Sequence, residues 1–255
     1  MYSVFDAAAG RWSLPEILGM PGESFNSSAG CTQRVDLENG EILLPVYFMK
    51  QGKSVVPGEN FYESVMVRCS FSGERMRVLE IGAPLGIDSP RGLYEPSLIR
   101  IGSDFYLTMR NDRCGYVAHS RDGLNFTPLR EWLFDDGELG SWNTQQHWIA
   151  LGERLYLVYT RRGAGNDHIF RNRAPLFIAE VDRETLRVIR SSERVAVPER
   201  GAHLGNFGCV RVSDRESWII VSEWMQTTPP DPFDWRRCMS YGSDNSVFIC
   251  RVCSG

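Results

Sequence analysis

The chain has 255 residues, 42% of them hydrophobic, and a formal net charge of -4 at pH 7. Its size and hydrophobic content allow a substantial buried core, and its acidic balance excludes a general attraction to nucleic acid or acidic lipid. The N-terminus has no basic stretch followed by an apolar run, and no window approaches the roughly 18 apolar residues of a membrane helix. We therefore expect a soluble, cytoplasmic globular protein without a nucleic-acid or membrane partner.

The seven cysteines are scattered and mostly lie within apolar runs, so we expect buried, reduced thiols and no disulfide framework. Cys250 and Cys253 form a C-x-x-C pair, but no second pair or histidine completes a zinc site. The sequence therefore predicts neither a metal nor a cofactor.

Hydrophobic periodicity predicts strands throughout the chain, because short apolar runs alternate with polar turns that often contain glycine. Four stretches share one pattern, which is a first strand, a tight turn and a second strand. These predicted hairpins begin at Cys31, Glu95, Gln145 and Asn206. They read CTQRVDLENGEILLPVYF, EPSLIRIGSDFYLTMRND, QQHWIALGERLYLVYTRR and NFGCVRVSDRESWIIVSEWM.

Most of these hairpins are followed by a second, more polar pair of strands, so that a four-stranded unit recurs about every 50 residues. This repeat predicts an all-β fold in which residues 1–255 form a single β-propeller domain of about five four-stranded blades. A six-bladed ring that is shortened at its N-terminus is the alternative. A β-sandwich also has many short strands, but it would not make the same inner hairpin recur.

The two ends of the chain each read as part of a blade. Residues 1–12 look like outer strands without an inner pair, and residues 244–253 look like a third strand after the last hairpin. Because an unpaired blade edge favours aggregation, we expect these ends to pair and close the ring. Strand-like sequence follows the proline-rich segment TTPPDPFDW, so this segment is expected to be an ordered insertion or a lid.

Polar side chains gather where the predicted hairpins begin and end. The first strand of each propeller blade lines the central channel, and the chain reverses once before the second strand ends, so both positions share one face. Repeats that differ in polar chemistry at such positions are typical of a binding site. The strand starts contribute Cys31, Gln33, Glu95, Gln145, Gln146, His147 and Asn206, and the strand ends contribute Arg110, Asn111, Asp112, Arg161, Arg162, Glu223 and Trp224.

A glycine-punctuated loop that is rich in arginine, RRGAGNDHIFRNRAPLF, follows the third hairpin. A solvated charged loop would explain this composition. However, guanidinium groups bind carboxylates bidentately, which favours a site for an anionic ligand. Tyr241 precedes the last predicted strand, and we expect it on the same rim. The loop contributes Arg161, Asp167, His168, Arg171 and Arg173.

Three stretches match features of one known superfamily. GLYEPSLIRIGSDFYLTMRND has its Glu-Pro-Ser strand opening and strand-end arginine, HSRDGLNF is similar to a shortened Asp-box, and YGSDNSV lies where the family has a tyrosine. In these features the chain resembles the sialidase-like (neuraminidase) superfamily of β-propeller glycoside hydrolases. NTQQHW, GNFG and EWMQ further resemble bacterial exo-α-sialidase-like proteins. The likeness covers nearly the whole chain from Ser28, although the Arg-Ile-Pro motif of sialidases is absent.

This resemblance implies a glycoside hydrolase that acts on an acidic sugar, either sialic-acid-like or uronic. Tyr241 with Glu95 or Glu223 would form the nucleophile pair, since a neutral phenol avoids repulsion by the charge of the substrate. Asp112 or Asp167 would be the acid/base. The substrate carboxylate and the sugar would be held by Arg110, Arg161, Arg171, Arg173, Gln145, Gln146, His147, His168 and Asn206.

Three other functions stay open at this point. The Glu-Pro-Ser opening and the S-x-D-G-x-x-F pattern also occur in five-bladed furanosidase-type glycoside hydrolases, in which Glu95 would pair with Glu223 or Asp167. A polysaccharide lyase would use His147 or Tyr241 to remove a proton next to an arginine-neutralised carboxylate. A propeller that binds a glycan without catalysis is the non-enzymatic alternative.

Overall fold

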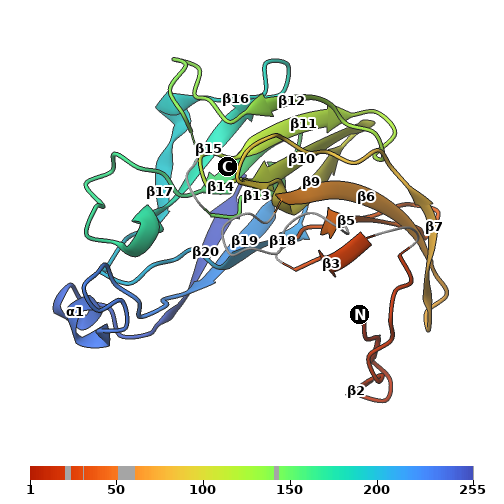
Figure 1. Cartoon of the computed structure of the whole chain (residues 1–255), viewed down its shortest axis with the longest axis horizontal. Coiled ribbons are helices and arrows are strands. Elements are labelled where there is room, and N and C mark those ends of the chain that lie inside the picture. The colour runs from red at the N-terminus through yellow and green to blue at the C-terminus, as the bar shows by residue number, and fades with distance from the viewer. Residues whose placement is uncertain (21–23, 31, 51–60, 141–143, 255) are drawn as a thin grey trace.

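The computed structural model describes residues 1–20, 24–30, 32–50, 61–140 and 144–254. Strands dominate, and four antiparallel sheets follow one another around a common centre as propeller blades (Figure 1). In the last three sheets the first strand lies nearest the centre, and the inner strands of neighbouring sheets contact one another. The predicted all-β propeller is therefore confirmed.

The first two blades form before residue 132. Blade 1 consists of β3 (Ser24–Ser28), β4 (Val35–Asp36), β5 (Ile42–Lys50), β6 (Phe61–Phe71) and β7 (Met76–Ile81), with β8 (Arg91–Gly92) parallel to β6. Blade 2 consists of β9 (Tyr94–Ile101), β10 (Asp104–Arg110), β11 (Tyr116–Ser120) and β12 (Thr127–Glu131).

The other two blades carry the few helical turns of the protein. Blade 3 consists of β13 (His147–Leu151), β14 (Arg154–Tyr159), β15 (Leu176–Asp182), β16 (Arg187–Val188) and β17 (Arg194–Val197), and blade 4 of β18 (Phe207–Ser213), β19 (Glu216–Ser222) and β20 (Val247–Cys253). The helices are η1 (Phe170–Asn172), η2 (Arg190–Ser192) and α1 (Trp235–Ser240). None of these helices is long and apolar enough to cross a membrane. Helix α1 follows the TTPPDPFDW segment between β19 and β20, so this segment is an ordered insertion.

The inner hairpins of blades 2 and 3 close through two residues each, 102–103 and 152–153. The first residue of each turn is a glycine at positive φ, 60° at Gly102 and 59° at Gly152. This conformation causes no steric strain in glycine and suits the twist of a tight hairpin. The repeated turn explains why the hairpins are visible in the sequence.

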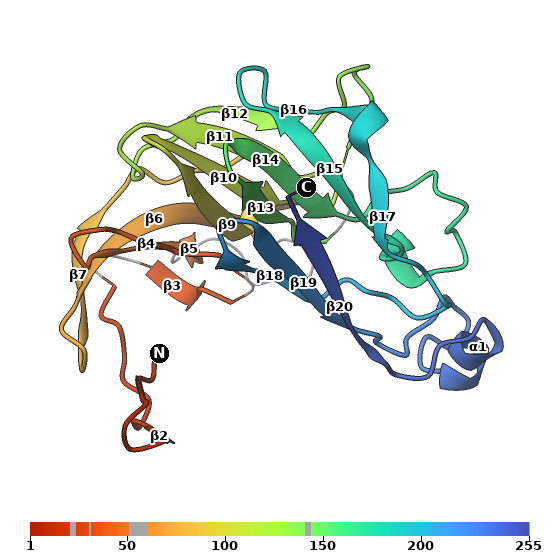
Figure 2. The ribbon, with the colours of Figure 1, turned by 180° about the vertical axis from the view of Figure 1, so that it is seen from behind.

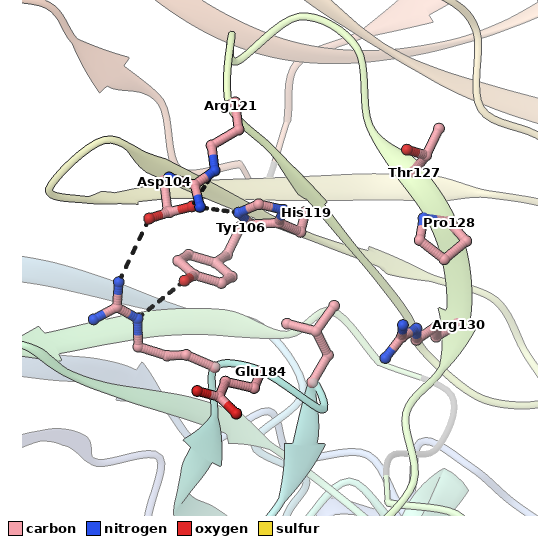
Figure 3. A pocket seen from close by; sticks show the side chains of 10 residues that line it. Asp104, Tyr106, His119, Arg121, Thr127, Pro128, Arg130 and Glu184 are labelled. Atoms are coloured by element: carbon pink, nitrogen blue, oxygen red, sulfur yellow. Dashed lines mark hydrogen bonds and ion pairs between the residues drawn. The ribbon is translucent and has the colours of Figure 1, made fainter.

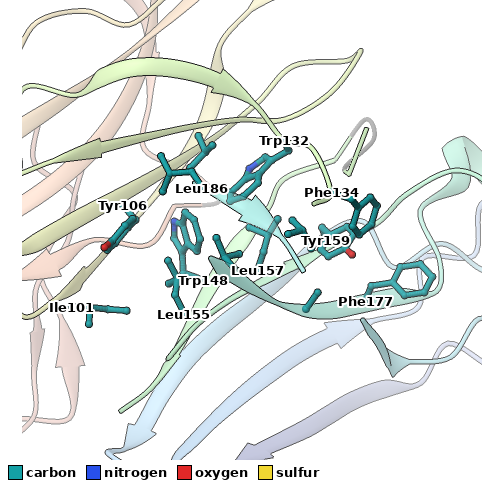
Figure 4. Close-up of a cluster of buried hydrophobic side chains, with 14 residues drawn as sticks. Ile101, Tyr106, Trp132, Phe134, Trp148, Leu155, Leu157, Tyr159, Phe177 and Leu186 are labelled. Atoms are coloured by element: carbon teal, nitrogen blue, oxygen red, sulfur yellow. The ribbon is translucent and has the colours of Figure 1, made fainter. Parts of the chain in front are cut away.

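Apolar side chains fill the spaces between neighbouring blades. The cluster between blades 2 and 3 is built around Trp132 and Trp148, whose ring centroids are 5.5 Å apart (Figure 4). Both indoles are buried, and both N–H groups have acceptors, Thr108 Oγ1 at 2.8 Å and the Ser97 carbonyl at 2.9 Å. Burial of a large apolar side chain contributes roughly 1.5–3 kcal/mol. These contacts therefore fix the two blades against each other.

One polar side chain joins three blades near the centre. Gln33, between β3 and β4, donates from Nε2 to the carbonyls of Trp148 at 2.9 Å and Cys209 at 3.4 Å. Its Oε1 accepts from the Trp148 N–H at 2.6 Å. Gln33 was expected near a ligand-binding rim, and in the structure it links blade 1 to the inner strands of blades 3 and 4.

The described residues form four blades, not five or six as predicted. Each recurring hairpin builds one blade, but β1 (Phe5–Asp6) pairs with β2 (Arg11–Trp12) across a short turn and forms a separate N-terminal hairpin (Figures 1 and 2). Among the described residues, β20 pairs with β19 only, so the predicted pairing of the chain ends is wrong. Blade 4 leaves Val210 and Val212 of its inner strand about half exposed, at 47% and 50%.

Candidate functional site

The backbone at the start of β9 turns the Glu95 side chain toward Arg110. The pairing register skips from Ser97–Thr108 to Tyr94–Arg110, so Glu95 and the proline after it stand opposite a single residue of β10. Such a β-bulge bends the strand and redirects a side chain. Glu95 has a φ of 48°, although it precedes a proline. Backbone strain of this kind costs of order 1–3 kcal/mol and is concentrated at functional sites.

Arg110, at the end of β10, holds two carboxylates at once. Its Nη1 donates to Glu95 Oε2 at 2.8 Å, and its Nη2 donates to Asp112 Oδ1 at 3.3 Å. The Arg110 side chain is only 7% exposed. Burial opposes its charge, but the neighbouring Glu95 raises the pKa of Arg110 above its ordinary value. Arg110 therefore fixes both carboxylates in place, one on each terminal nitrogen.

Tyr94 connects these ion pairs to the aromatic rings of Tyr47 and Tyr62. Its hydroxyl donates to Asp112, and burial raises the pKa of Tyr94 above its ordinary value, so the phenol stays protonated at neutral pH. The Tyr94 ring centroid lies 5.8 Å from that of Tyr62 and 6.2 Å from that of Tyr47. Arg91 approaches from another side, with Nη1 3.7 Å from Asp112 Oδ2. Aromatic faces beside convergent polar groups are typical of ligand sites.

Arg171 and Arg173 add positive charge to the same group. They flank Asn172 in η1, where Arg171 and Asn172 both have positive φ, 55° and 53°. Burial, together with the charges of Arg110 and Arg171, lowers the pKa of Arg173 to about 10. Glu95 opposes this shift but does not cancel it. Arg173 therefore lies close to two other guanidinium groups, those of Arg110 and Arg171, and to the carboxylate of Glu95.

We call this group the arginine–glutamate cluster. Among the described residues, the cluster combines four arginines with two carboxylates, a formal net charge of +2 in a partly buried place. Such a surplus attracts anions, and guanidinium groups bind carboxylates and phosphates with paired hydrogen bonds. The members of the cluster are Arg91, Arg110, Arg171, Arg173, Glu95 and Asp112.

His203 borders the cluster and is neutral at neutral pH. Burial and the charge of Arg173 lower the pKa of His203 to about 4. Its Nδ1 accepts from the Gly205 N–H at 3.3 Å, which leaves the proton on Nε2, 3.3 Å from Gln226 Oε1. The ring stacks on Trp224 with centroids 5.2 Å apart and an interplanar angle of 29°. His203 thus links the cluster to a half-exposed tryptophan.

The predicted ligand contacts at the start of blade 3 are closed to solvent. Gln145, Gln146 and His147 are at most 2% exposed. Gln145 Nε2 donates to the Phe207 carbonyl at 2.9 Å, and Gln146 bonds to two threonines. His147 Nδ1 lies 2.8 Å from Ser97 Oγ, and burial lowers the pKa of His147 to about 4. The structure places these three side chains in the packed centre, where they join blades.

Arg161 and Glu223 are engaged in ion pairs that hold loops. Arg161 donates to both carboxylate oxygens of Glu193, from Nε at 2.8 Å and from Nη2 at 2.6 Å. Glu223 is 3% exposed and accepts from Arg200 Nε at 3.0 Å. It also accepts from the backbone N–H groups of residues 244 and 246, both at 3.0 Å. Glu223 therefore fixes the loop that leads into β20.

Tyr241 and His168 form a separate pair. Their ring centroids lie 4.7 Å apart, and His168 Nε2 is 3.3 Å from Glu199 Oε2. In the part of the chain that the structure describes, no contact joins Tyr241 to Glu95 or Glu223. The nucleophile pair implied by the sialidase resemblance therefore stays a prediction.

Asn111 is buried and donates from Nδ2 to the carbonyls of Pro90 and Gly92, whereas two further predicted residues lie at the surface. Asp167 is exposed and accepts from Asn172 Nδ2 at 3.1 Å, which places it beside η1. Asn206 is exposed at the start of blade 4. Cys31 lies outside the described residues.

Three members of this site, Arg91, Tyr94 and His203, were missed by the sequence analysis. Arg91 and Tyr94 lie just before the predicted start of the second hairpin, and His203 lies just before that of the fourth. Their position in the sequence could have indicated them, because side chains that come shortly before the first strand of a blade share the rim with those at the start of that strand. Among the described residues, no group of three or more His, Cys, Asp or Glu side chains could hold a metal ion.

A hollow of about 600 Å³ lies between blades 2 and 3, away from the arginine–glutamate cluster (Figure 3). Asp104 is approached there by His119 Nε2 at 2.6 Å and by Arg121 Nε at 3.1 Å. Arg183 Nε donates to Tyr106 OH at 3.0 Å. Asp104 begins β10, whereas the arginine–glutamate cluster lies where β10 ends. The two places are therefore at opposite ends of blade 2.

The HSRDGLNF segment forms a compact turn between β11 and β12. Asp122 Oδ1 accepts from Ser120 Oγ and from the N–H groups of Leu124 and Asn125, each at 2.8 Å. Burial opposes the charge of Asp122, but these hydrogen bonds lower its pKa below the ordinary value. The turn lies at the same end of blade 2 as Asp104, away from the arginine–glutamate cluster.

No protein-family model and no curated protein matches this sequence. Several solved structures are similar to it. A Dyadobacter fermentans protein of unknown function aligns with a TM-score of 0.62 and 16% identity, over 89% of this chain and 60% of that chain. The GH32 β-fructofuranosidase of Bombyx mori aligns with a TM-score of 0.55 and 14% identity, over 86% and 47%. The Trypanosoma rangeli sialidase in complex with sialic acid aligns with a TM-score of 0.50 and 13% identity, over 77% and 29%.

At these identities the likeness establishes the fold. This chain has a propeller fold similar to those of a sialidase and a β-fructofuranosidase. It spans 60%, 47% and 29% of the lengths of the three matched chains.

Proposed function

We propose that this protein is a propeller glycoside hydrolase whose arginine–glutamate cluster binds an acidic sugar. The observation that carries the proposal is the geometry of the cluster, in which the buried Arg110 holds both Glu95 and Asp112 close to the buried Arg173. A substrate carboxylate between Arg171 and Arg173 would accept paired hydrogen bonds from their guanidinium groups. The matched sialidase and β-fructofuranosidase support the general class of function.

Glu95 is the proposed nucleophile and Asp112 the proposed acid/base. Both are held by one guanidinium group, and retaining glycosidases need two carboxyl groups only about 5–5.5 Å apart. Asp112 would enter the reaction in its protonated form. Glu95 would bond to the anomeric carbon as the glycosidic C–O bond breaks, and the Asp112 proton would pass to the departing oxygen. Water would then add its oxygen to the anomeric carbon, release Glu95 as a carboxylate and leave one proton on Asp112.

The positions of the other candidates favour this pair over a tyrosine nucleophile. Tyr241 stacks on His168, and the carboxylate of Glu223 is bound by Arg200 and two backbone N–H groups. A Tyr241 mechanism would need a carboxylate that activates the phenol.

Titration with acidic glycosides and their carboxyl-reduced analogues tests the proposal. The probes are the methyl glycosides of sialic acid and of glucuronic acid. We expect the parent protein to prefer at least one acidic form by roughly 1.5–3 kcal/mol, which is the contribution of a charged hydrogen bond. Arg171→Lys keeps the charge but loses the planar fork, so most of this preference should disappear.

Arg211→Lys is the matched control, because Arg211 is exposed on blade 4 and pairs only locally with Asp214. It should leave binding unchanged. Equal binding of the acidic and reduced forms by the parent protein would overturn the acidic-sugar proposal.

A second candidate function is glycan binding without catalysis. The observation in its favour is that Arg110 holds both Glu95 and Asp112, which makes neither an evident proton donor. This function predicts the same preference for acidic ligands but no product. Assays that follow reducing ends and the ultraviolet absorbance of unsaturated uronates together separate hydrolase, lyase and binding protein.

A further inference from the structure

The insertion between β19 and β20 presents large apolar side chains to solvent. Phe233 is 72% exposed, Met239 49% and Trp235 47%, and Trp224 at the end of blade 4 is 52% exposed. All four line one hollow of about 640 Å³. Exposed apolar patches that are contiguous usually mark a binding surface.

This aromatic surface is held by the fold. The Asp234 side chain caps α1 by accepting from the Arg236 N–H at 3.2 Å, and the Thr227 N–H donates to the Pro232 carbonyl at 2.9 Å. Cys238 of α1 is fully buried against the body of the protein. A rigid surface loses little conformational entropy on binding, which favours affinity. Figures 1 and 2 show α1 beyond the ends of the blade 4 strands.

The hollow and the arginine–glutamate cluster lie on either side of His203. Trp224 lines the hollow and also stacks on His203. His203 in turn lies close enough to Arg173 for the guanidinium charge to lower the histidine pKa. The buried His203 ring lies between Trp224 and Phe170, and Arg171 lies over the Phe170 ring at 5.1 Å. A ligand that spans both places would therefore pass over His203, from the exposed Arg171 to the half-exposed Trp224.

The chemistry of the hollow differs from that of the cluster. Its lining includes Glu223 and Asp244, and both carboxylates pair with Arg200, which is not part of the lining. Among the described residues, the lining therefore offers no cationic side chain to an acidic ligand. Its volume lies within the range of roughly 300–1,000 Å³ that is typical of small-ligand sites. A protein partner would instead need a surface of about 800 Å².

From these observations we propose that the hollow binds a neutral sugar unit linked to the acidic sugar in the arginine–glutamate cluster. The C–H face of the neutral ring packs on the indoles of Trp224 and Trp235, while the Asp244 and Asn245 side chains lie near its hydroxyl groups. The substrate class is then an oligosaccharide with an acidic terminal unit and a neutral neighbour. This inference rests on the proposed function and adds the second unit of its substrate.

Calorimetric titration with matched short and long ligands tests this inference. The pairs are sialic acid with sialyllactose, and glucuronic acid with a glucuronoxylan trisaccharide. The parent protein should bind the longer member of at least one pair roughly tenfold more tightly than the shorter member. Trp235→Ala should abolish that gain without changing the affinity for the acidic monosaccharide, and Trp235→Phe should keep most of it.

Trp12→Ala is the matched control, because Trp12 is 67% exposed on the N-terminal hairpin, and it should change neither affinity. The inference is overturned if Trp235→Ala leaves the longer ligand unaffected or weakens both ligands equally. Arg171→Lys with the monosaccharides reports on the proposed function separately. If the acidic preference is absent, the neutral sugars lactose and xylobiose still test the hollow. Trp235→Ala should weaken the binding of these two sugars. A parent protein that binds neither sugar would overturn the inference.

Discussion

Glu95 in blade 2 and Gln145 in blade 3 begin equivalent hairpins, yet only Glu95 lies in the arginine–glutamate cluster. In blade 2, a bulge with positive φ turns the carboxylate toward Arg110. In blade 3, the Gln145 side chain is buried and donates to the Phe207 carbonyl. The repeat determines where a residue enters the sheet, and the local backbone determines whether its side chain reaches the rim.

The largest expected effect is on catalysis. Glu95→Gln keeps the size and most hydrogen bonds of the side chain but removes the proposed nucleophile. We expect kcat on a cleaved acidic glycoside to fall by at least about 10²- to 10⁴-fold per folded molecule. Tm should fall as well, because the buried Arg110 loses its charged partner. Glu38→Gln is the matched control, because the Glu38 side chain is 91% exposed. An unchanged kcat in Glu95→Gln would remove Glu95 from the mechanism.

The two buried histidines should make the protein less stable in acid. His147 and His203 have pKa values of about 4, against an ordinary value of 6.5. Between these values the unfolded chain binds more protons than the folded protein, so the free energy of unfolding falls as the pH falls from 6.5 toward 4. Each histidine accounts for up to about 3 kcal/mol of this loss.

Urea unfolding at neutral pH and near pH 4.5 measures this effect. His147→Gln and His203→Gln should each make the stability less dependent on pH. Only His203→Gln, next to Arg173, should also change the binding of acidic sugars. Equal effects of both substitutions on binding would contradict the assignment of His147 to the packed centre.

A smaller loss is expected from the start of blade 3. Gln146→Leu leaves Thr108 and the Thr144 carbonyl without their buried amide partner, so the free energy of unfolding should fall by about 1–3 kcal/mol. Binding per folded molecule should not change, since Gln146 is fully buried. Asn206→Ala at the exposed start of blade 4 is the control and should alter stability by no more than about 0.5 kcal/mol.

The sequence predicted the propeller because its repeated signals are local. The glycines at 102 and 152 close equivalent turns, and the apolar runs beside them alternate as strands do. The number of blades was overestimated because short strands near both termini were counted as parts of a further blade. Whether such strands pair with each other or across the ring depends on contacts that are distant in sequence.

The candidate site could be predicted only in part for the same reason. Glu95 lies at the start of β9 and Arg110 at the end of the paired antiparallel strand β10, so their proximity follows from strand register. The burial of His147 depends on Ser97 in blade 2 and Phe207 in blade 4, which the local sequence does not reveal. The role of Arg173 depends on its burial next to Arg110, across two blades.

A crystal structure of the parent protein with a bound acidic glycoside tests the central claim most directly. We predict that the ligand carboxylate lies about 2.7–2.9 Å from guanidinium nitrogens of Arg171 and Arg173, with the sugar ring between Glu95 and His203. A glycoside bound instead beside Arg121 and Arg183 in the hollow of Figure 3, with no contact to the arginine–glutamate cluster, would contradict the account.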